Sequence, residues 1–154
     1  MQEEIRKIDW FVLHFDQLSN KQLYDLLRLR SEVFVVEQQC IFLDMDNLDQ
    51  QCYHVLGYWG DMLAGTTRLV PKGLAYTEYP SIGRVVTSPA LRGNGIGRQL
   101  MEFSILETTK LFGNSAIKIG AQLYLEKFYQ SLGFNRSGSV YLEDGIEHIP
   151  MILD

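Results

Sequence analysis

The sequence predicts an α+β fold, in which a mixed and mostly antiparallel sheet has helices on both of its faces. Apolar stretches of strand length outnumber the stretches with helical spacing. The helices are also too few and too unevenly spread for a doubly wound parallel sheet. The expected order is strand, helix, loop, two strands, a strand that leads into a glycine-rich loop and helix, then strand, helix and two closing strands.

The first part of the chain predicts one helix among strands. Ser19 is a suitable helix cap and Gln22, three residues on, is its capping-box partner, so a helix begins here and continues to Phe34. Aromatic and β-branched runs without helical spacing predict strands on either side of it. These runs are 10–15, 53–59 and 64–70, and the last two turn at Gly60 and Asp61.

The chain is organised around residues 81–99 (SIGRVVTSPALRGNGIGRQ). An apolar run predicts a strand, the loop 92–97 carries three glycines, and the spacing of Ile96, Leu100 and Phe103 predicts a helix. Glycines at a helix start let several backbone N–H groups converge, and the helix dipole adds positive charge there. The loop is therefore expected to bind an anion such as a pyrophosphate.

The last third predicts a strand at 116–121, a helix that ends at Gly133, and two closing strands around a turn at 143–145. The closing strands are expected at 140–142 and 149–153.

Composition limits the protein classes that fit. The 154 residues are interpreted as one domain, 1–154, with 46% hydrophobic and 21% charged residues. A net charge of -5 argues against nucleic acid, and no apolar run reaches the ~20 residues of a membrane span, so neither is expected as a partner. Cys40 and Cys52 lack metal-site spacing and, with no secretory signal, indicate a reduced, cytoplasmic setting. The oligomeric state stays open, with a homodimer as one option.

Two other phosphate-binding loops fit the glycines less well. A Walker A loop needs Gly-Lys-Ser/Thr where Arg98 and Gln99 stand, and a dinucleotide fingerprint needs Gly-x-Gly-x-x-Gly. The pattern Arg92-x-x-Gly95-x-Gly97 after a strand instead resembles the acyl-coenzyme A pyrophosphate loop of the GNAT N-acetyltransferases.

Two further blocks extend this resemblance over nearly the whole chain. The run 128–134 (FYQSLGF) resembles the GNAT motif whose tyrosine, here Tyr129, protonates the departing coenzyme A thiolate. The run 30–38 (RSEVFVVEQ), followed by Asp46, Asp49 and His148, resembles the ElaA-type branch of the family. The resemblance implies the GNAT fold.

The resemblance also implies an activity, an N-acyltransferase that uses acetyl-coenzyme A as co-substrate. A primary amine of a small molecule or peptide would take the acetyl group by direct attack. The alternative is a non-catalytic module that binds or senses acyl-coenzyme A on the same fold. In the enzyme the Val86 amide is expected to stabilise the oxyanion of the tetrahedral intermediate. The residues expected to hold coenzyme A are Val85, Val86, Arg92, Gly93, Asn94, Gly95, Ile96, Gly97 and Arg98.

A base is expected as well, because an alkylammonium is not a nucleophile. Some family members place a carboxylate on the central strand to act as the base. In this sequence Gly83 and Arg84 occupy that region, so this assignment does not carry over. Glu37, His54 and His148 remain as candidate bases, with Tyr129 as the acid.

The stretch 38–51 is predicted to be a solvated acidic loop. Its acidic residues, with Cys52 and His54, match neither zinc nor calcium spacing, so no metal site is expected. No Lys or Arg lies between Arg30 and Arg68, and such a loop beside the acceptor would attract cations. It therefore predicts a cationic acceptor, such as a polyamine or a basic peptide end. The acidic residues are Glu37, Asp44, Asp46 and Asp49.

Overall fold

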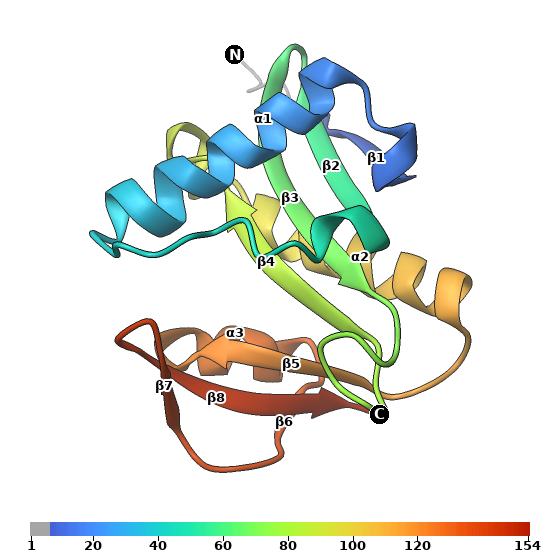
Figure 1. Cartoon of the computed structure of the whole chain (residues 1–154), viewed down its shortest axis with the longest axis vertical. Coiled ribbons are helices and arrows are strands. Elements are labelled where there is room, and N and C mark those ends of the chain that lie inside the picture. Colours follow the sequence, from blue (N-terminus) through green and yellow to red (C-terminus); the bar gives the residue numbers. More distant parts are fainter. Residues whose placement is uncertain (1–6) are drawn as a thin grey trace, which may run out of the picture.

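The computed structural model describes residues 7–154, whose strands form two antiparallel sheets (Figure 1). The first sheet has the order β1-β2-β3-β4. Its strands are β1 (Asp9–His14), β2 (Tyr53–Trp59), β3 (Met62–Val70) and β4 (Ser81–Thr87). The second sheet has the order β5-β8-β6, and β7 also pairs with β8. Its strands are β5 (Ile117–Gln122), β6 (Asn135–Arg136), β7 (Tyr141–Glu143) and β8 (Ile146–Leu153).

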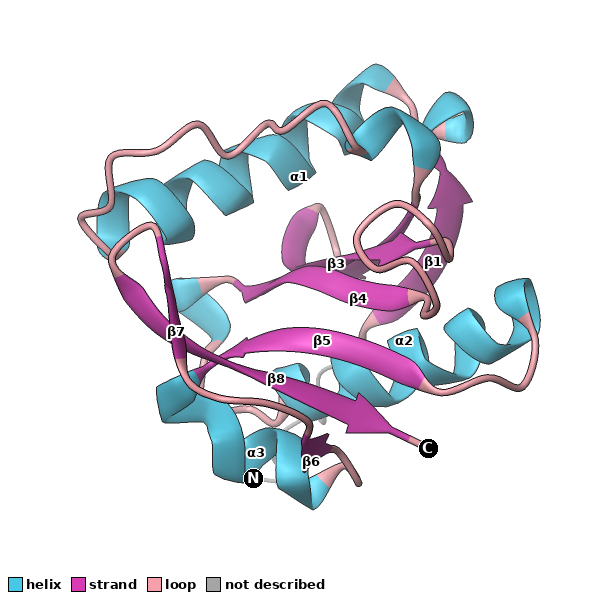
Figure 2. Cartoon of the chain, turned by 60° about the horizontal axis from the view of Figure 1, so that its bottom comes forward, coloured by secondary structure: helices cyan, strands magenta, loops and turns pink. Residues whose placement is uncertain are grey.

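Two helices cover opposite faces of the first sheet (Figure 2). They are α1 (Asn20–Arg30) and α2 (Ile96–Phe112). Neighbouring strand residues point to opposite faces, so Val55 joins the core cluster that holds Leu100 of α2, whereas Leu56 joins the cluster that holds Leu26 of α1. The short α3 (Glu126–Ser131) packs Tyr129 into the first of these clusters, with residues of β5 and β8. The prediction of an α+β fold with helices on both faces is confirmed.

Local sequence sets where the helices begin and end. Ser19 and Gln22 form the predicted capping box at the start of α1. The helix then widens into a π-helical segment, Ser31–Glu37, in which Val33 accepts from the amide of Gln38 at 3.0 Å. At the start of α2, Gly95 takes a left-handed backbone with φ of 71°.

The two sheets meet along β4 and β5. At the start of both strands the Lys118 amide donates to the Pro80 carbonyl at 3.1 Å. Beyond that point no strand pairing joins β4 to β5 within residues 7–154. One edge of β4 is therefore left open toward β5.

Most of the predicted strands and helices are found within three residues of their expected bounds. Three details differ: β6 was not expected, β8 begins at Ile146 rather than 149, and the end of the first helix is π-helical. No helix in the described part of the chain combines the length and apolar character needed to cross a membrane.

Candidate active site

A cavity of about 590 Å³ lies where β4 and β5 separate. Its walls come from the open edge of β4, the start of α2, β5, α3, the π-helical segment and the β7–β8 hairpin. Among the residues singled out in the sequence, this cavity brings together Glu37, Val85, Val86, Arg92, Gly97, Tyr129 and His148.

The glycine loop at one end of the cavity offers backbone groups rather than side chains. Gly93 and Gly95 have φ of 85° and 71°, the left-handed region where a side chain brings strain. Ile96 is buried in the core, so only its backbone is available, and Arg98 pairs with Glu102 at 3.0 Å. The first amides of α2 have no carbonyl of their own helix to bind, so this end of the cavity suits an anion.

Two groups stiffen this loop. The Asn94 amide group donates to the Leu91 carbonyl at 2.8 Å. Arg92 Nη1 donates to Glu37 Oε1 at 2.7 Å, which joins the loop to the π-helical segment. Since Glu37 already binds a guanidinium, its candidacy as the base is weakened.

Tyr129 belongs both to the core and to the cavity wall. It is 5% exposed, and its ring meets Phe128 and Phe134 edge-on at centroid distances of 5.2 and 5.9 Å. Burial raises the pKa of the Tyr129 hydroxyl, with a smaller contribution from Tyr124. The hydroxyl therefore keeps its proton at neutral pH and is able to donate it into the cavity.

His148 also lines the cavity and has the geometry of a base. Its Nδ1 lies 2.7 Å from the Ile146 carbonyl oxygen, which can only accept, so Nδ1 carries the proton in the neutral ring. Its Nε2 is then free to take a proton and lies 3.4 Å from Glu143 Oε2. Tyr141 stacks on the imidazole at 5.6 Å.

His54, the third candidate base, lies outside this cavity. It is 1% exposed on β2, and its Nε2 is 3.0 Å from the Asp49 carbonyl oxygen. Burial lowers the pKa of this imidazole. His54 supports the backbone at Asp49 and does not line the cavity in which the reaction is proposed.

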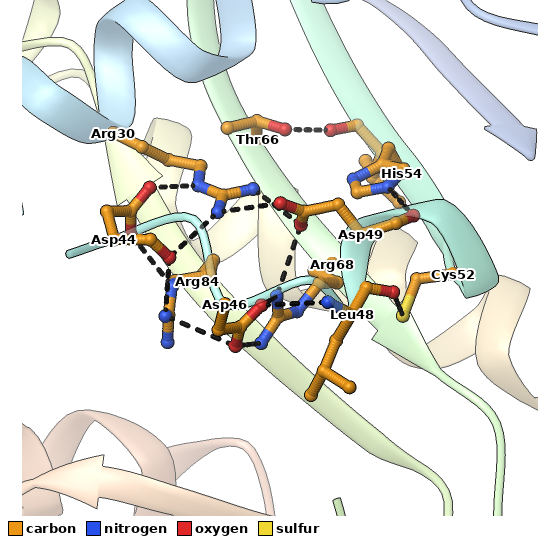
Figure 3. Close-up of polar contacts among 11 residues, drawn as sticks. Arg30, Asp44, Asp46, Leu48, Asp49, Cys52, His54, Thr66, Arg68 and Arg84 are labelled. Atoms are coloured by element: carbon orange, nitrogen blue, oxygen red, sulfur yellow. Dashed lines mark hydrogen bonds and ion pairs between the residues drawn. The ribbon is translucent and has the colours of Figure 1, made fainter. Parts of the chain in front are cut away.

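The segment 38–51 is not the solvated acidic loop that was predicted. Arg30, Arg68 and Arg84, from α1, β3 and β4, reach into it and bind its three aspartates in one network (Figure 3). Arg30, 1% exposed, is bound by Asp44 and Asp49, each at 2.8 Å. Arg68 binds Asp46 at 2.7 Å and Asp49 at 3.1 Å, and Arg84 binds Asp44 at 2.8 Å and Asp46 at 3.4 Å.

Three guanidinium groups thus balance three carboxylates. Burial by itself raises the pKa of Asp46, but the hydrogen bonds from Arg68 and the Leu48 amide, together with the charges of Arg68 and Arg84, outweigh it and bring that pKa to about 2. Burial also acts to raise the pKa of Asp49, but the hydrogen bonds and charges of Arg30 and Arg68 together outweigh it, so this pKa is lowered. Because the network is neutral as a whole, this loop cannot supply the acidic field on which the polyamine prediction rested.

Several cavity residues were not found from the sequence. Tyr76 lies in the connection before β4, which carries no recognisable pattern, and Tyr141 and Glu143 were treated as strand and turn residues. The further lining side chains missed in this way are Gln38, Cys40, Phe42, Gln122 and Tyr124. Among residues 7–154, no three His, Cys, Asp or Glu residues form a group that could hold a metal ion.

The chain is similar to known proteins both in sequence and in structure. The family model of the acetyltransferase (GNAT) domain matches residues 17–154. The chain is 44% identical to protein ElaA of Escherichia coli over 94% of its own length and 95% of that protein, and 42% identical to a UPF0039 protein of Synechocystis sp. over 95% of each. The crystal structure of Escherichia coli ElaA superposes with a TM-score of 0.89, covering 96% of this chain and 100% of that one, at 42% identity. An acyl-CoA N-acyltransferase from Pseudomonas aeruginosa gives 0.90 over the same shares, at 38% identity.

Proposed function

The chain belongs to the GNAT acetyltransferase family, in its ElaA-type branch, and from that premise we propose that it transfers an acetyl group from acetyl-coenzyme A to a primary amine. The resemblance seen in the sequence is thereby confirmed at the level of family and fold. The Pseudomonas aeruginosa relative is described as an acyl-CoA N-acyltransferase, in line with the proposal.

One observation carries the proposal: a proton donor and a proton acceptor line the same cavity as an anion-binding loop. Tyr129 is a buried phenol, His148 is an imidazole whose Nδ1 lies 2.7 Å from the Ile146 carbonyl oxygen, and the start of α2 offers free amides. Acyl transfer from a thioester to an amine requires these three functions together.

Coenzyme A would be bound mainly by backbone groups of the chain. The glycine loop and Arg92 would hold the pyrophosphate, since a Cβ built on Gly93 or Gly95 would meet nothing within 4 Å and the loop is open to an approaching group. The free edge of β4, at Val85 and Val86, would bind the amides of the pantetheine arm as an added strand would. Acetyl-coenzyme A, when bound, supplies an activated acetyl group.

The chain's own residues would then manage the protons. His148 Nε2 takes one proton from the attacking amine, and Glu143 beside it stabilises the imidazolium that forms. An amide at the open edge of β4 would stabilise the charge that develops on the acetyl oxygen. The Tyr129 hydroxyl gives its proton to the departing thiolate, and the second proton lost by the nitrogen restores the phenol, so that the amide forms neutral.

The test is a thiol-release assay with acetyl-coenzyme A and a set of primary amines, run beside calorimetric titration of acetyl-coenzyme A. We expect amine-dependent release of free thiol. The variant Gly95→Val should bind acetyl-coenzyme A more weakly, whereas Gly60→Val, at a left-handed glycine of the β2–β3 turn, should bind normally. Tight binding with no turnover on any amine would instead favour the sensing module.

A further inference from the structure

Two tyrosine hydroxyls from separate segments meet over one glycine of β5. A Cβ built on Gly120 would collide with the Tyr141 hydroxyl and lie 3.4 Å from that of Tyr76. All three residues line the cavity, and Gly120 is solvent-exposed. The absence of a side chain at Gly120 therefore lets the Tyr141 hydroxyl lie against β5, with the Tyr76 hydroxyl beside it.

Aromatic rings make up much of this side of the cavity. Tyr141 is stacked on His148, so the space beside Tyr141 adjoins the base. Phe42 also lines the cavity, with the Arg84 guanidinium over its ring at 6.0 Å. Flat rings of this kind favour an apolar or aromatic body and can also face a cation.

The free charge that lines this side of the cavity is negative; the Lys118 ammonium lies over the Tyr76 ring at 4.8 Å, but Lys118 is not a lining residue. Glu143 is 59% exposed in its side chain and lies 3.4 Å from His148, and Asp144 follows it. The arginine that lines this side, Arg84, is bound by Asp44 and Asp46 and so contributes little free positive charge. Burial, with the nearby Tyr141 and Glu143, raises the pKa of Tyr76 to about 12, so its hydroxyl stays neutral.

We propose, as a refinement that rests on the proposed function, that the acceptor is a small primary amine with an aromatic or flat apolar body. Glu143 attracts the ammonium group to His148, which removes one proton, while the body lies against the rings of Phe42, Tyr76 and Tyr141. A polyamine would need several separated carboxylates, and those of the 38–51 segment are bound to arginines.

The experiment compares 2-phenylethylamine with propylamine, spermidine and a short peptide that has a free α-amine. We expect kcat/KM for 2-phenylethylamine to exceed that of each other amine by about tenfold or more, the discrimination that a fitted apolar subsite provides. Direct binding of 2-phenylethylamine to the coenzyme A complex, followed by NMR, gives a second readout that does not depend on turnover.

Glu143→Gln and Glu147→Gln form a matched pair of variants. Both remove one carboxylate from the same hairpin, but Glu147 is exposed and does not line the cavity. Glu143→Gln should weaken 2-phenylethylamine binding and lower kcat/KM by about tenfold, and Glu147→Gln should leave both within about twofold. Gly120→Ala should lower both for this amine and leave acetyl-coenzyme A affinity unchanged.

The outcomes separate the two proposals. A preference for spermidine or the peptide, or equal losses in the two glutamate variants, would overturn the aromatic acceptor while acetyl transfer stands. Binding of 2-phenylethylamine that depends on Glu143, with no thiol released from any amine, would support the subsite and overturn the transferase.

Discussion

Tyr129 shows how one side chain serves both packing and chemistry. Its ring contacts Phe128 and Phe134 in the core, and Tyr129 is also one of the residues that line the cavity. No residue in the described range 7–154 forms a hydrogen bond with this hydroxyl, so its proton is available to a group in the cavity. A tyrosine hydroxyl is already protonated near neutral pH at its ordinary pKa of about 10, and burial raises the pKa of Tyr129 further.

Replacing Tyr129 with Phe separates the two roles. The ring and most of the packing remain, so we expect the melting temperature to change little. Loss of one general acid lowers rates by about 10²- to 10⁴-fold, and kcat should fall in that range while the calorimetric affinity for acetyl-coenzyme A is kept. A wild-type kcat in Tyr129→Phe would make Tyr129 a core residue only.

Sequence alone could identify the cavity residues that belong to short motifs. Gly97 and Tyr129 each stand within a block of a few residues whose spacing carries the prediction. Tyr76 and Tyr141 are 65 positions apart and meet only because the connection before β4 and strand β7 both pass over Gly120. Contacts of this kind depend on the tertiary fold, which leaves no local periodicity to read.

At the scale of elements, the segment 38–51 also could not be predicted from local sequence. Its aspartates have the composition of a surface loop, but Arg30, Arg68 and Arg84 lie on three other elements at sequence separations of 14 to 40 residues. Helices and strands were predictable because their periodicity is local. The burial of this loop was not, since it arises from ion pairs that only the assembled sheet permits.

Arg30 is the anchor of this segment. Arg30→Ala would leave Asp44 and Asp49 buried without their main partner, which costs about 3–5 kcal/mol of the free energy of unfolding. Arg28→Ala removes an exposed pair with Glu32 in the same helix turn and should cost less than about 1 kcal/mol. Denaturant unfolding measures both, and equal losses would mean that the buried network contributes no more than a surface pair.

The same network predicts a dependence on pH. The folded pKa of Asp46 is about 2, below its ordinary value of 3.8, so its contribution is fully present above about pH 4 and is lost as pH falls toward 2. Discounted for the partial exposure of this carboxylate, Asp46→Asn should cost about 1 kcal/mol at pH 7 and almost nothing near pH 2. Asp61→Asn, at the exposed β2–β3 turn, removes the same charge as a control. A pH-independent difference would show that Asp46 acts by packing.

At the scale of the whole molecule, the cavity exists because the two sheets are joined at only one end of β4 and β5. The Pro80–Lys118 hydrogen bond holds the starts of the strands, and their far ends are free to line a cavity. A ligand held by the edge of β4, the loop before α2 and Tyr129 of α3 therefore touches both halves of the fold. Binding should stabilise the two sheets together rather than one of them.

Acetyl-coenzyme A at about 100 times its Kd should stabilise the folded chain by about 2.7 kcal/mol, or roughly 5–10 °C in Tm for a domain of this size. Hydrogen exchange should slow in β4 and at 92–98, and also in β5 and around Tyr129, because one ligand bridges both sheets. Strand β1, at the far edge of the first sheet, serves as the internal reference and should change least. Protection confined to the first sheet would place coenzyme A outside the gap between β4 and β5. It would also contradict the assignment of Tyr129 as the proton donor.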